Sequence, residues 1–346
     1  MINLEKEIRE QPAALSTVVD LNLAAAKEIV AKAKAAGVKH VYFAARGTSD
    51  HACVYAQYLF GIFAGIPCTL GTPSVFTKYG AHIDLSDDLV IGVSQSGKAE
   101  DVLAVLESAK KDGAITVAVT NNEDSPMAKC AAYHLYCGCG HEASIAATKT
   151  FTTQMTILGL LAAVWAGNEA LIAEFRKLPD AAQAMLDTKY DRIMNFARKY
   201  QNIPGAILLG RGISYPIALE GALKMLETNK LKMKGYPTSD FHHGPIAQVK
   251  PGDLVFVLSP KGATGDDSRA VIEKLLGVGA DVVVITDDAG EAPDGTTAVV
   301  LPSTGCEFTF PQIAVMFFQL LACCMTIVRG IDPDKAGVIN KITITK

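Results

Sequence analysis

The sequence predicts an α/β protein made of two tandem, doubly wound domains with parallel sheets, followed by a C-terminal tail. Three observations lead to this prediction. The chain has 346 residues, which is more than a single domain usually holds. Near-continuous apolar strands alternate with amphipathic helices, as they do where a parallel sheet is covered on both faces. The second half of the chain also repeats the pattern of the first half.

The repeat keeps its register over a long stretch of sequence. VYFAARGTSDHACVYAQYL, which starts at Val41, resembles AILLGRGISYPIALEGALK, which starts at Ala206, at an offset of 165 residues. DLVIGVSQSG from Asp88 matches DLVFVLSPKG from Asp253 at the same offset, and ITVAVTNN matches VVVITDD after one inserted residue. Each half is therefore expected to hold a strand, a Gly/Ser turn, a helix and a further strand, in that order.

The segments around the two repeats set the expected domain boundaries. The five parts are an N-terminal segment (1–22), a first domain (23–167), a helical linker (168–201), a second domain (202–330) and a tail (331–346). The linker is expected to be helical because it is a charged stretch with helical spacing. The tail ends in N-K-I-T-I-T-K, whose alternation of apolar and polar residues indicates a strand or an extended arm.

The most apolar stretch, from Phe310 to Val328, is predicted to be a buried core helix. Pro311, Gln312 and Gln319 interrupt it, and the two glutamines share one helical face, which argues against a membrane span. The opening segment carries charges of both signs and lacks the apolar run of a secretory signal. We therefore expect a cytoplasmic protein that does not associate with membranes.

Composition and charge narrow the class of protein further. Hydrophobic residues make up 49% of the chain and charged residues 20%, which is enough apolar material for well-formed cores. The net charge is −4 and no basic run is present, so nucleic acid is not an expected partner. The eight cysteines are scattered and are expected to be reduced. Cys137, Cys139 and His141 lack the fourth ligand of a zinc site, so we predict no metal and no other cofactor.

Two turns of the first half are predicted to bind an anion. In an open parallel sheet, ligands lie beyond the carboxyl ends of the strands, where turns lead into helices. Ser94, Gln95 and Ser96 form such a turn, and Thr48 and Ser49 lie on the equivalent turn of the first strand. Hydroxyls, an amide and backbone N–H groups can bind phosphate there, although serine and threonine also simply cap helices. The second half has Ser-Pro-Lys at the matching turn, and proline removes a donor, so we expect one phosphate site.

A second group of residues suits proton transfer. Glu220, Lys224 and Glu227 are spaced four and three residues apart, so they project from one face of a helix. The same spacing is also usual for an ordinary surface ion pair. His243 precedes a Gly-Pro pair that fixes the backbone, and an imidazole suits proton transfer near neutrality, although a lone histidine is more often structural. Lys341 could attack a carbonyl if desolvated, although a lysine in a tail is normally solvated.

These features together resemble the sugar isomerase (SIS) family, in particular the isomerase half of glucosamine-6-phosphate synthase and stand-alone glucosamine-6-phosphate deaminases. The resemblance spans nearly the whole chain. The motifs that carry it are KEIREQP at 6–12, ARGTSDHA at 45–52, SQSG at 94–97, EASIAATKTF at 142–151, ALEGALK at 218–224, HGP at 243–245 and the closing NKIT. The resemblance implies two tandem SIS domains of flavodoxin-like fold.

The resemblance also implies a role for each motif residue. Glu227 would move a proton between C1 and C2 of a sugar phosphate, His243 would assist ring opening, and Lys341 would sit at the carbonyl carbon. The residues that it assigns to phosphate, sugar or their immediate neighbours are Thr48, Ser49, Ser94, Gln95, Ser96, Lys98, Glu142, Ile145, Lys149, Glu220 and Lys224. Family members are typically homodimers in which the histidine segment reaches the partner subunit, so we expect shared active sites.

Three departures from the family pattern bear on the substrate. Ala99 stands where relatives carry a hydroxyl, and Lys98 beside it could compensate with charge. Lys232 and Lys234 replace a customary histidine and glutamate, which could change the amine substituent that is recognised. Ala336 and the glycine after it replace a customary Pro-Arg near the tail.

The resemblance leaves three functions to compare. No glutaminase region and no N-terminal catalytic cysteine are expected, which favours deamination of glucosamine 6-phosphate with water to fructose 6-phosphate and ammonia. A fructosamine-type (fructoselysine or glucoselysine) 6-phosphate deglycase is the alternative, motivated by Ala99 and the altered K-M-K segment. A non-catalytic sugar-phosphate sensor is an alternative of another class, although the three catalytic positions are present.

Overall fold

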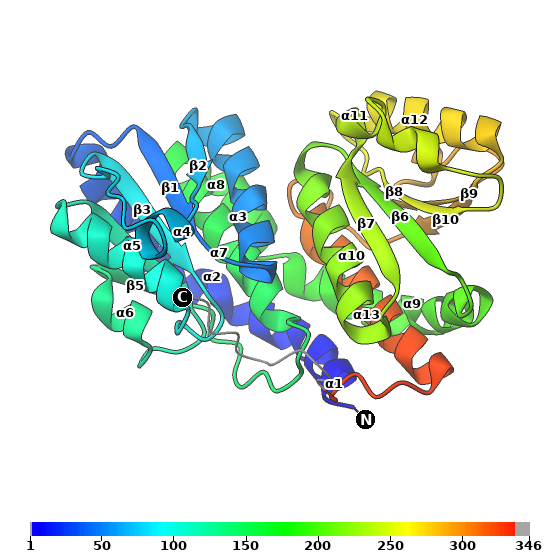
Figure 1. Cartoon of the computed structure of the whole chain (residues 1–346), viewed down its shortest axis with the longest axis horizontal. Coiled ribbons are helices and arrows are strands. Elements are labelled where there is room, and N and C mark those ends of the chain that lie inside the picture. Colours follow the sequence, from blue (N-terminus) through cyan, green and yellow to red (C-terminus); the bar gives the residue numbers. More distant parts are fainter. Residues whose placement is uncertain (1, 336–346) are drawn as a thin grey trace. The chain divides into compact units, whose positions relative to one another are not determined.

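The computed structural model describes residues 2–335, so Lys341 and Ala336 lie outside the described residues. The described chain divides into two compact units (Figure 1). The N-terminal unit comprises residues 10–143 and 149–179, and the C-terminal unit comprises residues 2–9, 144–148 and 180–335.

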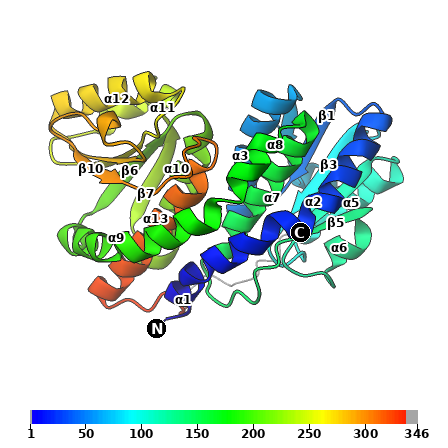
Figure 2. The ribbon, with the colours of Figure 1, turned by 180° about the vertical axis from the view of Figure 1, so that it is seen from behind.

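The N-terminal unit is built on a five-stranded parallel sheet in the order β2-β1-β3-β4-β5. The strands are β1 (His40–Ala44), β2 (Cys68–Leu70), β3 (Asp88–Val93), β4 (Ile115–Thr120) and β5 (Tyr133–Tyr136). The helices are α2 (Gln11–Ala35), α3 (Thr48–Leu59), η1 (Phe60–Ala64), α4 (Ser74–Thr77), α5 (Glu100–Lys111), α6 (Pro126–Cys130), α7 (Lys149–Ala166) and α8 (Glu169–Phe175). Helices α2, α3 and α7 pack together on one face of this sheet, and α4, α5 and α6 pack on the other (Figures 1 and 2).

The C-terminal unit has a second five-stranded parallel sheet in the order β10-β9-β8-β6-β7. The strands are β6 (Gly205–Gly210), β7 (Lys232–Pro237), β8 (Leu254–Leu258), β9 (Asp281–Thr286) and β10 (Thr297–Val300). The helices are α1 (Asn3–Arg9), α9 (Leu178–Tyr200), η2 (Gly212–Ser214), α10 (Tyr215–Asn229), α11 (Thr238–Phe241), η3 (Pro245–Gln248), α12 (Gly265–Val278), η4 (Ala289–Glu291) and α13 (Phe310–Arg329). Two of them, α10 and α13, share one face of the sheet, whereas α11 and α12 share the other.

The predicted fold class is confirmed, because both sheets are parallel and are covered by helices on both faces. The repeat of the sequence is a repeat of the structure: β1, β3 and β4 occupy the same places in the first sheet as β6, β8 and β9 in the second. Both sheets are doubly wound. The chain builds each sheet outward in two opposite directions, so each sheet has a switch point between the two strands where these directions part. The switch point lies between β1 and β3 in the first sheet and between β6 and β8 in the second.

Helix α13 forms much of the core of the C-terminal unit. All its residues from Phe310 to Thr326 are buried, which confirms the prediction of a core helix. It is the one helix among residues 2–335 that has the length and apolarity to cross a membrane, and 89% of its most apolar window is buried inside the protein. Gln319 lies on this helix and donates from Nε2 to the carbonyl of Thr148 over 3.3 Å.

Candidate active site

The N-terminal unit places both predicted phosphate turns at the switch point of its sheet. β1 and β3 are neighbours that run parallel, so the turns that follow them lie at the same edge. Thr48 and Ser49 begin α3, and Ser94 to Ser96 follow β3 and lead into α5. Ser49 is buried and the other four side chains are half-buried. The structure therefore gathers five predicted ligands around two helix starts, where N–H groups and hydroxyls can bind a phosphate.

The conformation of the second turn depends on a glycine. Gly97 has φ +64°, and a Cβ added there would lie 2.2 Å from Oγ of Ser125. Ser125 cannot move aside freely, because its Oγ accepts a hydrogen bond from the backbone N–H of Ala128 at the start of α6. The carbonyl oxygens of Gln95 and Gly97 accept from the N–H groups of Asn121 and Met127 over 3.0 and 3.2 Å. We call this turn, together with Thr48 and Ser49, the phosphate cradle.

Substitution of Gly97 by alanine is expected to weaken binding of fructose 6-phosphate more than tenfold, because the turn must shift to relieve the clash. It should also lower the free energy of unfolding by about 1–3 kcal/mol, from strain at positive φ and overpacking. Isothermal titration calorimetry and chemical denaturation measure the two effects. Gly113→Ala is the matched control, since its φ is +88° but an added Cβ has no neighbour within 4 Å. A Gly97→Ala protein that binds as tightly as the Gly113→Ala protein would contradict this role for the turn.

In the C-terminal unit, carboxylates of the same chain fill the matching cradle. The N–H of Lys261 donates to Asp287 over 2.9 Å, and the N–H of Ala263 donates to Glu307 over 2.9 Å. A Cβ on Gly262 would lie 1.6 Å from the same Glu307 carboxylate. The side chain of Lys261 pairs with Asp288 over 2.9 Å. Because these donors already bind anionic oxygens, this cradle is unsuited to phosphate, which supports the expectation of one phosphate site.

The Glu220-Lys224-Glu227 group on α10 is not a surface ion pair. Glu220 is fully buried, and Lys224 is only 2% exposed. The ammonium of Lys224 lies 3.2 Å from Glu220 and 2.5 Å from Glu227. Although burial alone would lower the pKa of Lys224, attraction to Glu220 and then to Glu227 raises it above its usual value. Lys224 therefore stays charged, and Glu227, whose side chain is 21% exposed, is the end of the group that a substrate can reach.

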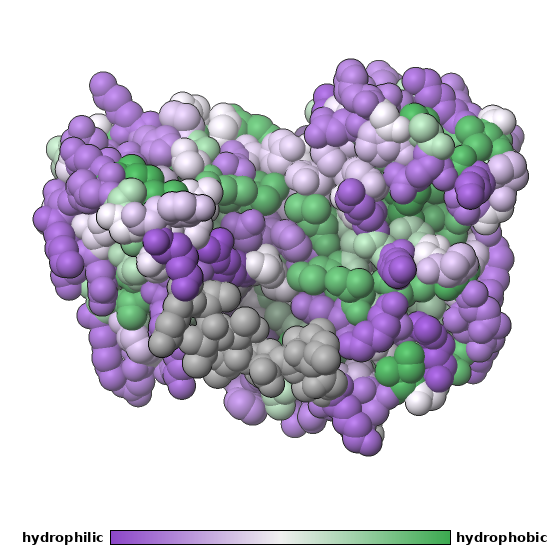
Figure 3. All heavy atoms as spheres, viewed as in Figure 1, coloured by the Kyte–Doolittle hydropathy of each residue, from purple (hydrophilic) through white to green (hydrophobic). Residues whose placement is uncertain are grey.

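A groove lies beside the end of α10 that carries Glu227. It has a volume of about 560 Å³ and runs past the first residues of β6, β7 and β8. Leu226 and Met233 supply apolar lining, and Lys232 and Lys234 lie on the same edge strand, β7. Figure 3 shows hydrophobic surface, in green, over α10 and β7, interrupted by hydrophilic side chains. The ammonium of Lys234 lies 4.7 Å from the ring centroid of Tyr236.

His243 lies apart from Glu227 within the C-terminal unit. It is exposed and follows α11, which packs with α12 on the face of the sheet opposite α10. Gly244 takes φ +146°, a conformation that favours glycine, and it starts the turn into η3. The sheet therefore stands between His243 and the helix that carries Glu227. The third predicted catalytic residue, Lys341, is outside the described residues.

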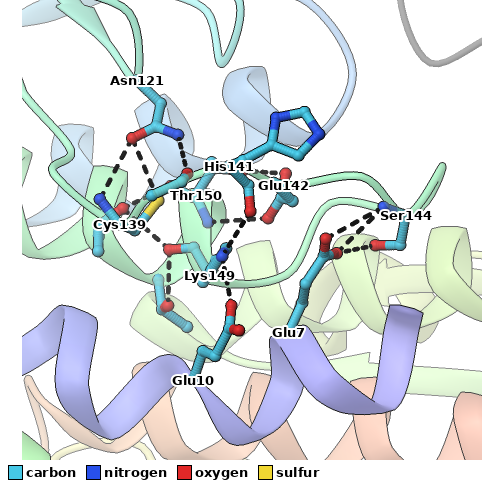
Figure 4. A network of polar contacts seen from close by, with 12 residues as sticks. Glu7, Glu10, Asn121, Cys139, His141, Glu142, Ser144, Lys149 and Thr150 are labelled. Carbon is cyan, nitrogen blue, oxygen red and sulfur yellow. Dashed lines mark hydrogen bonds and ion pairs between the residues drawn. The ribbon is translucent and has the colours of Figure 1, made fainter. Parts of the chain in front are cut away.

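The loop before α7 is held by buried polar side chains (Figure 4). Glu142 is buried, and its carboxylate accepts from the N–H and the hydroxyl of Thr150 over 3.1 and 2.8 Å, which caps α7. Lys149 is also buried and donates to Glu10 over 2.5 Å and to the carbonyl of His141 over 2.7 Å. These contacts favour a positioning role for Glu142 and Lys149 over direct contact with a sugar. Ile145 is half-buried.

Sequence reasoning missed several residues that shape this loop. Asn121 donates from Nδ2 to the carbonyl of Gly140 over 2.7 Å and accepts from the N–H of Cys139 over 3.2 Å. In the C-terminal unit, the buried carboxylate of Glu7 accepts from both the N–H and the hydroxyl of Ser144. Glu7 and Glu10 belong to the KEIREQP motif, which marks this segment as part of the family pattern. The sequence does not indicate which side chains of the motif hold the loop.

The cysteines near this loop are buried thiols. Burial raises the pKa of Cys139 to about 12, and Cys137 is fully buried. The sulfur of Cys139 lies 3.3 Å from Oδ1 of Asn121. No group of three or more His, Cys, Asp or Glu side chains within residues 2–335 is arranged to hold a metal ion.

Comparisons with known proteins agree with this geometry. The SIS domain family matches residues 36–164 and 200–325. Glutamine–fructose-6-phosphate aminotransferase (isomerizing) of Caldanaerobacter subterraneus is 32% identical over 97% of this chain, and the match covers 58% of that relative. The chain thus spans a little over half the length of the curated relatives it matches.

Two solved structures superpose on nearly the whole chain. The C-terminal domain of glucosamine-fructose-6-phosphate aminotransferase from Francisella tularensis has a TM-score of 0.87 and 26% identity, with 96% of this chain and 98% of that one covered. A protein from Silicibacter pomeroyi DSS-3, described as a candidate phosphosugar isomerase, has a TM-score of 0.87 and 31% identity, with 96% and 100% covered.

Proposed function

The chain belongs to the SIS domain family, and from that premise we propose that it is a phosphosugar isomerase that deaminates an amino-sugar 6-phosphate. The substrate that fits best is glucosamine 6-phosphate, which with water gives fructose 6-phosphate and ammonia. The observation that carries the proposal is Glu227, a carboxylate that is partly exposed and held in place by the buried ammonium of Lys224. The relatives named above support an amino-sugar or ketose 6-phosphate as the substrate class.

The proposed chemistry begins with the open-chain sugar bound through its phosphate. Thr48, Ser49 and the turn at 94–96 bind the phosphate, while Lys98 adds charge at the edge of the cradle, where it is exposed. Glu227 removes the proton from C2 and returns it to C1, while one proton leaves the nitrogen and one joins O1. The product is a C2 imine. Water then adds to C2, the C–N bond breaks, and ammonia leaves with the ketone formed.

We propose that the enzyme works as a homodimer with shared active sites. His243 lies across the sheet from the helix that carries Glu227 in one unit, so a second copy is the simplest source of an imidazole for ring opening. Lys341 is proposed to act at the carbonyl carbon. The same proposal places the enzyme in the cytoplasm, which agrees with eight cysteines that form no disulfide bond within residues 2–335.

Incubation of the purified protein with glucosamine 6-phosphate is expected to release ammonia and fructose 6-phosphate in equal amounts. A coupled assay for each product measures the two yields, and N-acetylglucosamine 6-phosphate is the control, since its acylated nitrogen resists imine formation. The family assignment would stand without this activity. A protein that binds fructose 6-phosphate but forms neither product at micromolar enzyme would contradict the deaminase proposal.

One observation favours a second candidate function, a fructosamine-type 6-phosphate deglycase. Lys232 and Lys234 are exposed beside the groove, close to the end of α10 that carries Glu227. Two ammonium groups there could bind the carboxylate of an amino acid attached to the sugar nitrogen. Release of free lysine from fructoselysine 6-phosphate, at a kcat/KM above that for glucosamine 6-phosphate, would select this reaction instead.

A further inference from the structure

Arg46 occupies a distinctive place beside the phosphate cradle. It lies just past the carboxyl end of β1, immediately before Gly47, Thr48 and Ser49. Its Nε donates to Oδ2 of Asp101 over 2.6 Å. Asp101 lies in the first turn of α5, the helix that follows the turn at 94–97, and its side chain is only 2% exposed. The ion pair therefore bridges the two loops of the cradle across the switch point between β1 and β3.

The guanidinium of Arg46 retains capacity for a second anion. Asp101 binds Nε, and the guanidinium forms no further hydrogen bond or ion pair with residues 2–335. The Asp50 carboxylate is a second negative charge near it: burial raises the pKa of Asp50, and attraction to Arg46 opposes that rise. The side chain is 46% exposed, so a ligand can reach its free edge. A buried carboxylate on one edge also limits rotation of the planar group, which lowers the entropy lost when a ligand binds.

The chemistry of the cradle calls for such a charge. Its other donors are hydroxyls, an amide and backbone N–H groups, which are neutral, whereas a sugar phosphate is close to a dianion at neutral pH. Ala99, at the start of α5, has no hydroxyl that could supply a further donor. Lys98 is the other cation of the turn, but its side chain is exposed and forms no ion pair or hydrogen bond with residues 2–335 that would fix it.

The repeat provides an internal reference for this ion pair. Arg211 follows β6 as Arg46 follows β1, and its Nε lies 2.7 Å from Oδ2 of Asp267 in the first turn of α12. The same bridge thus spans the switch point of the second sheet. There, however, the cradle is filled by Asp287 and Glu307. Because the ion pair occurs in both halves, it has a structural purpose in linking two loops of the sheet edge. The first half differs from the second in that no carboxylate of the described chain fills the cradle next to the ion pair.

We propose that Arg46 binds the substrate phosphate directly and selects phosphorylated over unphosphorylated sugars, with Asp101 as the residue that positions it. This inference rests on the phosphate site of the proposed function and adds to it a charged ligand. Nε stays with Asp101, and the two Nη groups donate to phosphate oxygens in the fork geometry that suits arginine. Arg211 is only a bridge between loops.

The test is calorimetric binding of fructose 6-phosphate and inorganic phosphate to the 346-residue chain and four variants. Arg46→Gln keeps an amide donor for Asp101 but removes the charge, and we expect roughly 10- to 100-fold weaker binding of both ligands. Arg46→Lys should recover part of this loss. Arg211→Gln, the matched control, should bind within about twofold of wild type. Asp101→Asn should weaken binding less than Arg46→Gln does, because the charge of Arg46 remains.

Three results would overturn the proposal. If Arg46→Gln and Arg211→Gln bind the two ligands with equal affinity, Arg46 is only a structural bridge. The same conclusion follows if Arg46→Gln binds more weakly than wild type and Arg46→Lys recovers none of the lost affinity. Failure of the wild type to bind either phosphate compound would remove the site itself. Melting temperatures of all variants separate these results from unfolding. These experiments measure binding and not turnover, so the two proposals can fail separately. A wild type that binds fructose 6-phosphate but releases no ammonia from glucosamine 6-phosphate contradicts the deaminase proposal, whereas the proposed role of Arg46 in phosphate binding still depends on the variants.

Discussion

Glu227→Gln is expected to lower kcat for glucosamine 6-phosphate by about 100- to 10,000-fold, the range usual for loss of a general base. The amide has the same shape, so it can still fill its place on α10 and accept a hydrogen bond from Lys224 through its oxygen. It cannot take a proton from C2. Affinity for fructose 6-phosphate should therefore change little, since the phosphate cradle belongs to another part of the chain. Steady-state kinetics and calorimetry measure the two quantities.

Solvent exchange gives a more direct readout of the same prediction. In deuterated water, the wild type should introduce deuterium at C1 of fructose 6-phosphate, and Glu227→Gln should not, which NMR detects without any coupled enzyme. Glu273→Gln is the matched control, because Glu273 is an exposed glutamate on α12 of the same unit. If Glu227→Gln keeps more than a tenth of wild-type exchange, another group moves the proton and the proposed mechanism is wrong.

The parallel sheets could be predicted because their signal is local. Each buried strand is a short apolar run that ends in a Gly/Ser turn, and the repeat shows the same order twice. The carboxyl ends of β1 and β3 meet at one edge by the rules of parallel sheets, so the turns that hold Ser94 and Thr48 could be brought together without coordinates.

The burial of Glu220 and Lys224 on α10 could not be predicted from the sequence, because it depends on segments that are distant in the chain and pack together only in the fold. Glu220, Lys224 and Glu227 have the spacing of a surface ion pair, and spacing is all that the sequence offers. Helix α13, about ninety residues further along the chain, packs on α10, and Glu220 is fully buried in the folded unit. The same limitation applies to Lys149, whose partner Glu10 is 139 residues away.

The difference between the two cradles was visible in part. Ser-Pro-Lys in place of Ser-Gln-Ser suggested that the second turn had lost a donor. The stronger reason is the carboxylate of Glu307, which comes from a loop 44 residues beyond Ala263 and has no sequence signature. Arg46 lies in the ARGTSDHA motif, but the sequence indicates no role for it, because its pairing with Asp101 exists only when both loops are folded.

The buried group on α10 leads to the largest expected effect on stability. Replacement of Lys224 by methionine keeps most of the apolar volume but leaves Glu220 fully buried without a cation. Loss of one partner from a buried pair typically costs about 3–5 kcal/mol, so the free energy of unfolding should fall by that amount near pH 7. Chemical denaturation measures it. Lys177→Met is the matched control: Lys177 pairs with Glu174 over 2.5 Å, but the lysine is 54% exposed, so the change should stay below about 1 kcal/mol.

The pH dependence of the Lys224→Met protein identifies the cause of the loss. In the wild type, the pKa of Lys224 is higher in the folded protein than in the unfolded chain, where it is about 10.5. The stabilisation that the charged lysine gives the fold is therefore fully present below about pH 10.5, and it is lost only as pH rises through the higher pKa of the folded protein. Stability should then be insensitive to this lysine between pH 5 and 9. In the variant, Glu220 can relieve its isolation by taking up a proton, so the deficit should shrink as pH falls toward 5.

A second substitution decides whether charge or packing is responsible. Adding Glu220→Gln to Lys224→Met removes the uncompensated charge, so the double variant should regain at least about 2 kcal/mol at pH 7 and lose the acid-dependent recovery. If the double variant is no more stable than the single one, the loss comes from a cavity at position 224 and not from Glu220. In that case Lys224 would hold Glu227 by packing, and Lys224→Met should leave the protein as unstable at pH 5 as at pH 7.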